Sequence, residues 1–213
     1  MYIIDDTYFV RDLNIPNSNE AQTDAGNNLE SFIDEQCRLL LLNLLGYPLF
    51  KELDSYVVSG VFITLETPQK WIDFVKGKEY TKNGKLVKWQ GLISTQGVFK
   101  KSLMANYVYY HYLSSEQSTL SSVGEMVVEA KNGIRVNSTQ KLVSVWNYFL
   151  EMYQGSQKYL FPKFYYKGFV PITDYLAHNP TSEISAIEFL IDNKIDFPDA
   201  SLMRYEVQNQ LGI

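Results

Sequence analysis

Residues 100–153 read KKSLMANYVYYHYL (100–113), SSEQSTLSSVGE (114–125), MVVEAKNGIRV (126–136) and NSTQKLVSVWNYFLEMY (137–153). The first and last pieces carry apolar residues at helical spacing, so they predict helices over about 99–113 and 137–153. Between them lie a polar loop and a strand-like piece with an Asn-Gly turn. Connections of that length in compact domains are usually functional or disordered. We therefore expect two packed helices joined by a loop that has a functional role.

Two more helices are expected on the N-terminal side of this stretch. Residues 29–45 repeat apolar side chains at the i, i+3, i+4 spacing, and Gly46 predicts the end of that helix. The pair Thr67-Pro68 has the residue types that start a helix, and Gly77 predicts where that second helix stops.

The dipeptide Asn83-Gly84 lies between two strand-like pieces and is the strongest hairpin signal in the chain. Lys82 and Lys85 flank this turn. One interpretation is a solvated hairpin whose edge lysines block pairing with other sheets. The other is a basic finger in which Lys82 and Lys85 touch an acidic partner or a DNA backbone.

Residues 156–180 are rich in aromatic side chains and contain internal prolines, which predicts an irregular arm with a binding surface. Tyr165, Tyr166 and Phe169 are the candidate contact residues of this arm.

Beyond the arm, Thr181 or Ser182 is expected to cap a further helix. Its apolar face is expected to carry Ile184, Ile187, Leu190 and Ile191. Residues 194–213 show less pattern, and we expect them to dock either on this chain or on a neighbour.

These elements predict a mainly α fold, an antiparallel helical bundle with one or two small β-hairpins and an irregular C-terminal arm. The predicted domains are a helical bundle over 1–155, with a hairpin insertion at about 58–98, and a C-terminal arm with a short helix over 156–213.

The chain has 213 residues and a formal net charge of −5, which argues against a protein that coats nucleic acid as a monomer. Its single cysteine, Cys37, excludes an intramolecular disulfide framework. The N-terminus lacks the features of a signal peptide, and the longest apolar run is too short to span a bilayer. We therefore expect a soluble protein that is made in the cytoplasm and has no membrane partner.

Motifs for catalysis, metals and phosphates are missing from the sequence. Two histidines and one cysteine cannot supply a zinc site of the usual kinds, and no phosphate-binding loop or nucleophile elbow is present. His111 is expected to be a core or boundary histidine bonded to backbone. We predict no catalytic residue, no metal and no cofactor, and hence a protein that is not an enzyme.

Three segments resemble the head–tail connector family of tailed phages, also called adaptor or head-completion proteins. They are LLLLNLLGYPLFKEL (39–53), the aromatic helix around NYVYYHYL (106–113), and the loop SSVGEMVVEAKNGIRVNSTQKLVSVWNYF (121–149). The resemblance covers roughly 29–57 and 99–153. It implies a subunit of a ring, commonly twelve-fold, that lies under the portal, joins the capsid to the tail and retains the packaged DNA.

The partners implied by this resemblance are other copies of the chain, the portal protein and the next neck or tail protein. Non-specific contact with packaged DNA is a further expectation, and the location is the neck of the virion. The candidate contact residues in the loop are Glu116, Val123, Glu125, Val127 and Arg135. The alternatives are a non-enzymatic protein-interaction module and another ring protein of the virion or tail.

Overall fold

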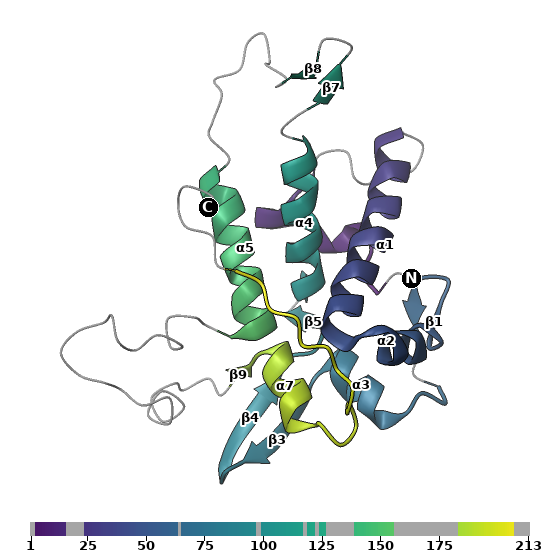
Figure 1. Ribbon diagram of the computed structural model, residues 1–213, viewed down its shortest axis with the longest axis vertical. Coiled ribbons are helices and arrows are strands. Elements are labelled where there is room, and N and C mark those ends of the chain that lie inside the picture. The colour runs from purple at the N-terminus through teal and green to yellow at the C-terminus, as the bar shows by residue number, and fades with distance from the viewer. Residues whose placement is uncertain are drawn as a thin grey trace, which may run out of the picture.

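The computed structural model describes residues 3–15, 24–63, 65–96, 99–116, 119–121, 124–126, 139–155 and 183–206. The helices of this part are α1 (Asp24–Leu45), α2 (Tyr47–Asp54), α3 (Gln69–Lys76), α4 (Leu103–Glu116), α5 (Thr139–Gln154) and α7 (Ala186–Asp192), with short 3-10 helices η1 (Asp6–Tyr8) and η2 (Arg11–Leu13). Figure 1 shows their arrangement.

Short strands form four small sheets in the described residues. Three are antiparallel hairpins: β1 (Val57–Val58) with β2 (Val61–Phe62), β5 (Ile93–Gln96) with β6 (Phe99–Ser102), and β7 (Thr119–Ser121) with β8 (Gly124–Met126). The fourth has the order β3-β4-β9, in which β3 (Lys78–Lys82) pairs antiparallel with β4 (Lys85–Trp89), and β9 (Glu183–Ile184) joins β4 in parallel.

The predicted fold class is wrong, because the protein is a mixed α/β fold and not a mainly α helical bundle. Residues 99–102 show one cause of the error. They were expected to begin a helix, but they form β6 and pair with β5 from Ile93↔Ser102 to Gln96↔Phe99. The helix begins only at Leu103, where the Ser102 hydroxyl accepts a hydrogen bond of 3.0 Å from the Met104 N–H.

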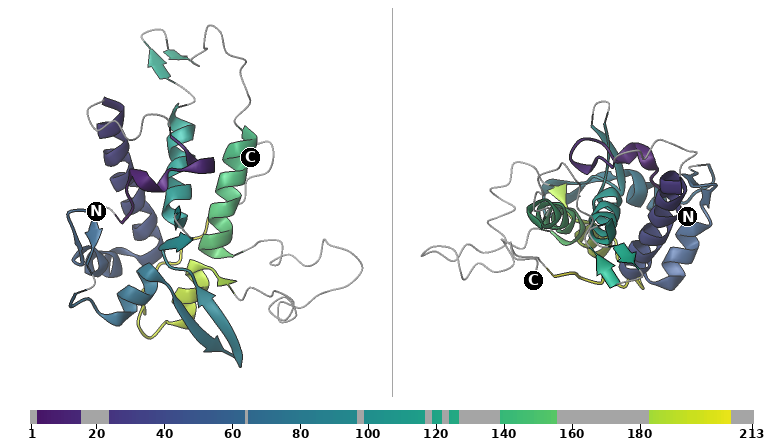
Figure 2. Two further views of the ribbon diagram at one scale, coloured as in Figure 1. Left: turned by 180° about the vertical axis from the view of Figure 1, so that it is seen from behind. Right: turned by 90° about the horizontal axis from the view of Figure 1, so that it is seen from above.

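The upper half of the molecule is built from α1, α4 and α5, with α4 between the other two (Figures 1 and 2). Helix α4 is apolar on nearly every side, which predicts enclosure by neighbours. The buried side chains of α4 are Leu103, Met104, Ala105, Tyr107, Val108 and Tyr109. The position of α4 between two helices explains this composition.

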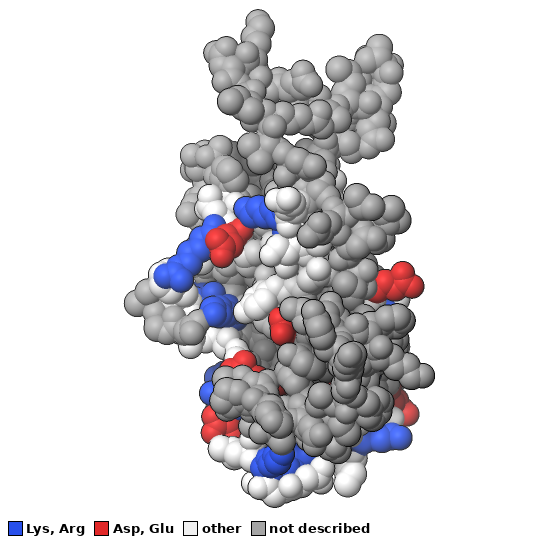
Figure 3. Space-filling model, turned by 90° about the vertical axis from the view of Figure 1, so that its left-hand side faces the viewer, with Lys and Arg blue, Asp and Glu red and all other residues white. Residues whose placement is uncertain are grey.

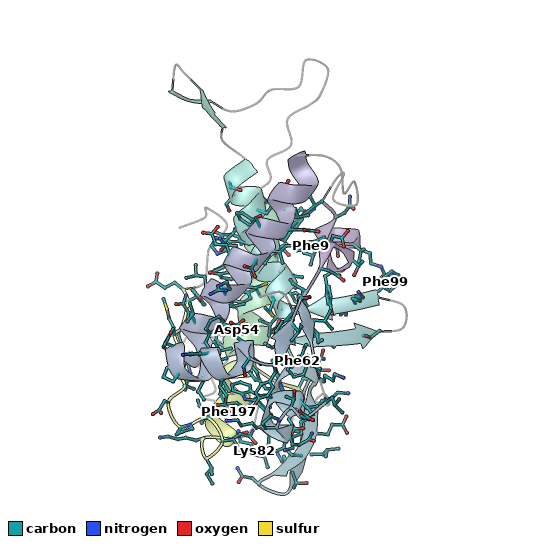
Figure 4. The ribbon with its side chains drawn as sticks, turned by 90° about the vertical axis from the view of Figure 1, so that its right-hand side faces the viewer. Phe9, Asp54, Phe62, Lys82, Phe99 and Phe197 are labelled. Carbon is teal, nitrogen blue, oxygen red and sulfur yellow. The ribbon has the colours of Figure 1, made fainter. Side chains whose placement is uncertain are left out.

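The lower half packs α3 and α7 against the β3-β4-β9 sheet through large aromatic side chains. Phe74 of α3 lies 6.2 Å from Phe189 of α7 and 5.8 Å from Phe197, and Phe189 stacks on Trp89 of β4 at 5.8 Å. Figure 4 shows Phe197 in this part of the molecule, with Lys82 nearby on β3. The residues of both halves belong to one continuous hydrophobic core.

The predicted cap of the last helix is corrected by the structure. Ile184 belongs to β9, and the helix begins after Ser185, whose hydroxyl accepts a hydrogen bond of 3.3 Å from the Glu188 N–H. The sequence interpretation failed because a two-residue strand leaves no periodic pattern of its own. The predicted caps, Thr181 and Ser182, lie outside the described residues, as does the whole of the predicted arm over 156–180.

Local backbone predictions are confirmed at three points. Asn83 and Gly84 have φ of 51° and 76° between paired Lys82 and Lys85, the left-handed pair that a two-residue hairpin turn needs. Gly46 and Gly77 follow α1 and α3 with φ of 77° and 96°. A Cβ on Gly77 would also lie 2.6 Å from the Trp89 carbonyl oxygen, so this stop is required by close packing as well.

Candidate functional site

The α4–α5 pair is held together by an aromatic cluster at its centre. Tyr107 of α4 lies 6.2 Å from Trp146 and 5.2 Å from Phe149, both on α5. Rings at these separations gain from their edge and face electrostatics as well as from burial. The two packed helices therefore form the frame from which the segment between α4 and α5 extends.

His111 lies at the edge of this cluster. Its ring is 4.4 Å from Tyr107, 5.2 Å from Tyr110 and 6.1 Å from Trp146. Burial lowers the pKa of His111 because the charged imidazolium is desolvated there. The expected bond to backbone is not made by Nε2, which is buried and has no hydrogen-bond partner among the described residues. These surroundings are those of a neutral boundary histidine.

The connection between α4 and α5 includes a small hairpin. β7 pairs with β8 in the register Thr119↔Met126, Leu120↔Glu125 and Ser121↔Gly124. Figure 1 shows this hairpin beyond the C-terminal end of α4, at the opposite end of the molecule from the β3–β4 hairpin. Apart from Met126, this hairpin lies in the stretch that was predicted to be a polar loop, 114–125. The predicted strand-like piece over 126–136, with its Asn-Gly turn, lies outside the described residues apart from Met126.

Two of the predicted contact residues of the loop lie in the described part of the chain, and three do not. Glu116 is the last residue of α4, and Glu125 lies in β8 opposite Leu120. Val123, Val127 and Arg135 lie outside the described residues. Predicted contact residues of the arm, Tyr165, Tyr166 and Phe169, lie outside them too.

Lys82 is a structural residue and does not project as part of a basic finger. Its Nζ lies 2.8 Å from Glu188 Oε1 and 2.9 Å from Asp192 Oδ1, both on α7. Burial alone would lower the pKa of Lys82, but the hydrogen bonds and charges of these two carboxylates outweigh it, and the pKa is raised. The lysine therefore joins the β3–β4 hairpin to α7.

Asp192 also accepts a hydrogen bond of 2.6 Å from the Tyr80 hydroxyl. Burial and this bond to a carboxylate both raise the pKa of Tyr80, so the phenol stays protonated. In the cluster of Tyr80, Lys82, Glu188 and Asp192, one ammonium group and one phenol hydroxyl thus face two carboxylates.

The other hairpin lysines are mostly paired as well. Lys78 lies 2.6 Å from Asp73, and Lys88 lies 3.2 Å from Glu79. Lys85 is exposed across the turn from Lys82, and no ion pair of this lysine occurs in the described part of the chain. On the face in Figure 3, described basic and acidic side chains are interspersed. These pairs favour the interpretation of a solvated hairpin over that of a basic finger.

The C-terminal residues 199–206, here called the tail, begin in a turn at Asp199 and cross α1 and α5 without regular secondary structure, with a φ of 53° at Leu202. Leu202 N–H donates to the Leu44 carbonyl at 3.0 Å, and Met203 N–H donates to the Asn43 carbonyl at 3.2 Å. These two carbonyls lie in the last turn of α1, where no intrahelical donor remains. The tail therefore completes the end of that helix.

Helix α5 binds the same tail through side chains. The Tyr153 hydroxyl donates to the Met203 carbonyl at 2.8 Å, and Trp146 Nε1 donates to the Glu206 carbonyl at 2.9 Å. The Gln154 amide donates to the Tyr205 carbonyl at 2.8 Å and accepts from the Tyr205 N–H at 3.0 Å. The Gln154 side chain thus pairs with both main-chain groups of Tyr205, as the backbone of a neighbouring β-strand would.

The sequence left open where this tail would dock, and the structure places its described part on its own chain. No signal in residues 194–213 identified the docking position. The side chains of α5 bond to main-chain carbonyls of the tail, which any sequence carries, and the bonded residues lie more than 40 positions apart in the chain. The tail-binding surface, defined here as Asn43, Leu44, Tyr107, Trp146, Tyr153 and Gln154, is the best-defined recognition surface in the described chain.

Within the described residues there is no group of three or more His, Cys, Asp or Glu side chains that could hold a metal ion. None of the described helices is long and apolar enough to cross a membrane. The chain matches no protein-family model, and no curated protein or solved structure matches it significantly.

Proposed function

We propose that this chain is a structural subunit of a ring that joins the portal and capsid to the tail in a tailed phage. The proposal starts from the resemblance of 29–57 and 99–153 to the connector family. The observation that supports it best is the α4–α5 frame, which carries the β7–β8 hairpin beyond the end of α4 (Figure 1). This is an arrangement suited to contact and not to chemistry.

The hairpin offers a physical means of contact. β7 and β8 are each three residues long and pair with each other in the register given above. The outer edge of such a hairpin carries backbone groups that can pair with a strand of a neighbour. Repetition of one such head-to-tail contact between identical subunits closes a ring.

The proposed partners are other copies of this chain, the portal protein and the next neck or tail protein. In this role the chain would sit in the neck of the virion and help to retain packaged DNA. Any contact with that DNA would be non-specific and would come from the assembled ring, since the single chain is acidic.

A second candidate function, a non-enzymatic interaction module outside a ring, is favoured by the β1–β2 hairpin. Val58, Val61 and Leu65 are 55%, 67% and 80% exposed, and residues 56–65 carry no charge. Exposed apolar segments of this kind mark contact surfaces.

Native mass spectrometry and negative-stain microscopy of the purified chain test the proposal, alone and with portal rings encoded in the same genome. We expect a closed ring of this chain, formed either alone at high concentration or on the portal. A chain that stays monomeric at high concentration and does not bind portal rings contradicts the proposal. Binding to a different protein without ring formation supports the interaction module.

A further inference from the structure

The tail is recognised mainly through its backbone. Six main-chain groups of residues 202–206 form hydrogen bonds with α1 and α5: the N–H groups of Leu202, Met203 and Tyr205, and the carbonyls of Met203, Tyr205 and Glu206. Bonds of this kind recognise a peptide backbone in a fixed register, whatever its side chains.

One side chain of the tail adds specificity. The Tyr205 ring lies 5.3 Å from Tyr153, 5.6 Å from Trp146 and 6.0 Å from Tyr107. The Tyr205 hydroxyl accepts a hydrogen bond of 3.0 Å from the Asn43 amide. The surface thus supplies aromatic contacts for the Tyr205 ring and a hydrogen-bond donor for its hydroxyl, the two interactions that a buried tyrosine requires.

Other side chains of the tail contribute less. Ser201, Met203, Arg204 and Glu206 are exposed, whereas Ala200 and Leu202 are partly buried besides Tyr205. The recognition pattern is therefore the backbone of residues 202–206 with a tyrosine three residues after a leucine.

The segment between Phe197 and Leu202 is long enough for the tail to be exchanged with that of an adjacent copy. Phe197 is buried in the lower core, Asp199 and Ser201 are exposed, and Ala200 between them is partly buried. The five steps along the chain from Phe197 to Leu202 can span up to about 17 Å when extended. A change of direction here would carry the tail to an adjacent copy without disturbing Phe197.

We propose that the tail-binding surface is a docking site for a tyrosine-anchored peptide, and that in the assembled ring it binds the tail of the neighbouring copy. The second half of this inference rests on the proposed ring. An exchanged tail keeps every hydrogen bond described above, so exchange costs little beyond reorientation of the connection. In a free subunit the tail binds in cis because its local concentration is in the millimolar range.

Peptide binding by the full-length chain tests the docking site. The probe is a fluorescent peptide with the sequence DASLMRYE (199–206), followed by anisotropy. Tyr205→Ala should weaken the resident tail and raise peptide affinity about tenfold over wild type, and Tyr205→Phe should give an intermediate gain. Adding Gln154→Ala to Tyr205→Ala should reverse the gain.

The matched control is Arg204→Ala, because Arg204 is exposed on the same tail and should leave peptide affinity at the wild-type level. A peptide with alanine in place of its tyrosine should not bind. The docking site is overturned if folded Tyr205→Ala and Tyr205→Phe chains, checked by circular dichroism, bind the peptide no better than wild type.

Disulfide trapping tests exchange between copies. Asn43→Cys and Met203→Cys are combined in one chain, since the two main chains are joined there by a 3.2 Å hydrogen bond and Cys37 is fully buried. Oxidation of free subunits should give an internal disulfide, which verifies the geometry. Oxidation of assembled rings should give covalent multimers on a non-reducing gel.

The outcomes separate the two proposals. Rings that yield only internally linked monomers overturn tail exchange and leave the ring function intact. A wild-type chain that forms no ring, alone or on the portal, removes the proposed function and tail exchange together, while the peptide experiment still decides the docking site.

Discussion

Lys82 makes more ion pairs than the other described lysines of its hairpin, so its replacement should destabilise the contact between the β3–β4 hairpin and α7. Lys82→Met removes the cation between Glu188 and Asp192, which are 36% and 14% exposed in their side chains, and leaves two carboxylates facing each other. We expect the free energy of unfolding to fall by about 1–2 kcal/mol in urea titrations. Lys85→Met, across the same turn, should change it by less than about 0.5 kcal/mol. Equal effects of the two variants would contradict the role assigned to Lys82.

His111 should make stability depend on pH. Burial lowers the pKa of His111 in the folded protein below its ordinary value of 6.5, so the unfolded chain takes up a proton first as the pH falls. The free energy of unfolding should therefore decrease as the pH falls through 6.5 toward the lowered folded pKa. Carboxylates titrate below this window, at about pH 4.

Urea titrations of wild type and His111→Gln at about pH 7.5 and 5.5 measure this dependence. The variant should lose less stability between the two values than wild type does. His178→Gln measures the contribution of the other histidine in the chain. An unchanged pH dependence in His111→Gln would show that His111 titrates normally.

Residues whose role is local could be predicted from the sequence, and residues whose role depends on distant partners could not. Asn83-Gly84 and Gly77 were identified because a turn or a helix end is a property of a few adjacent residues. Lys82 was assigned to a free surface because its partner Glu188 on α7 is 106 residues away. The sequence alone contains no signal of that distance.

At the scale of the element, the start of α4 is set by Ser102. Its hydroxyl accepts from the Met104 N–H at 3.0 Å and donates to the Leu92 carbonyl at 2.6 Å, and the residue is buried. Ser102→Ala should therefore lower the free energy of unfolding by about 1–2 kcal/mol, as measured by thermal or urea unfolding.

Ser115→Ala is the matched control, because the Ser115 hydroxyl is exposed and bonds only within the last turns of α4, to the Tyr112 carbonyl. It should be near neutral. If Ser102→Ala were equally neutral, the transition from β6 to α4 would have to be fixed by other contacts.

The strands, more than the helices, limited prediction from the sequence. Helices α1, α4 and α5 were found to within a few residues, because α1 and α5 present several turns of apolar spacing and α4 is apolar on nearly every side. β1, β2 and β9 have two residues each, too few for an alternating pattern. Strands this short form because tertiary packing brings them together, which is why a mixed fold was taken for a bundle.

At the scale of the whole molecule, the tail ties the two halves together. Phe197 is anchored in the lower cluster of Trp71, Phe74 and Phe189, and Tyr205 is anchored in the upper cluster on α4 and α5. The segment from Phe197 to Tyr205 thus joins the lower and upper aromatic clusters of one continuous core. A change at either anchor is therefore expected to weaken the upper and lower halves together.

The division between a folded frame and a contact hairpin can be tested by deleting residues 118–123, which removes β7. The buried residues that join α4 to α5 lie outside this segment. We expect circular dichroism to show unchanged helicity, with the free energy of unfolding within about 0.5 kcal/mol of wild type. Ring formation, on the other hand, should be lost in native mass spectrometry and microscopy.

A second variant separates the loss of the strand from the shortening of the connection. Replacing 118–123 with six Gly and Ser residues keeps the length but removes the strand-forming sequence, and this variant should also fail to form rings. Rings formed by the replacement but not by the deletion would mean that only the length of the connection matters. A loss of helicity in both variants would show that the hairpin belongs to the frame, because a segment used only for contact between subunits contributes nothing to the fold of one.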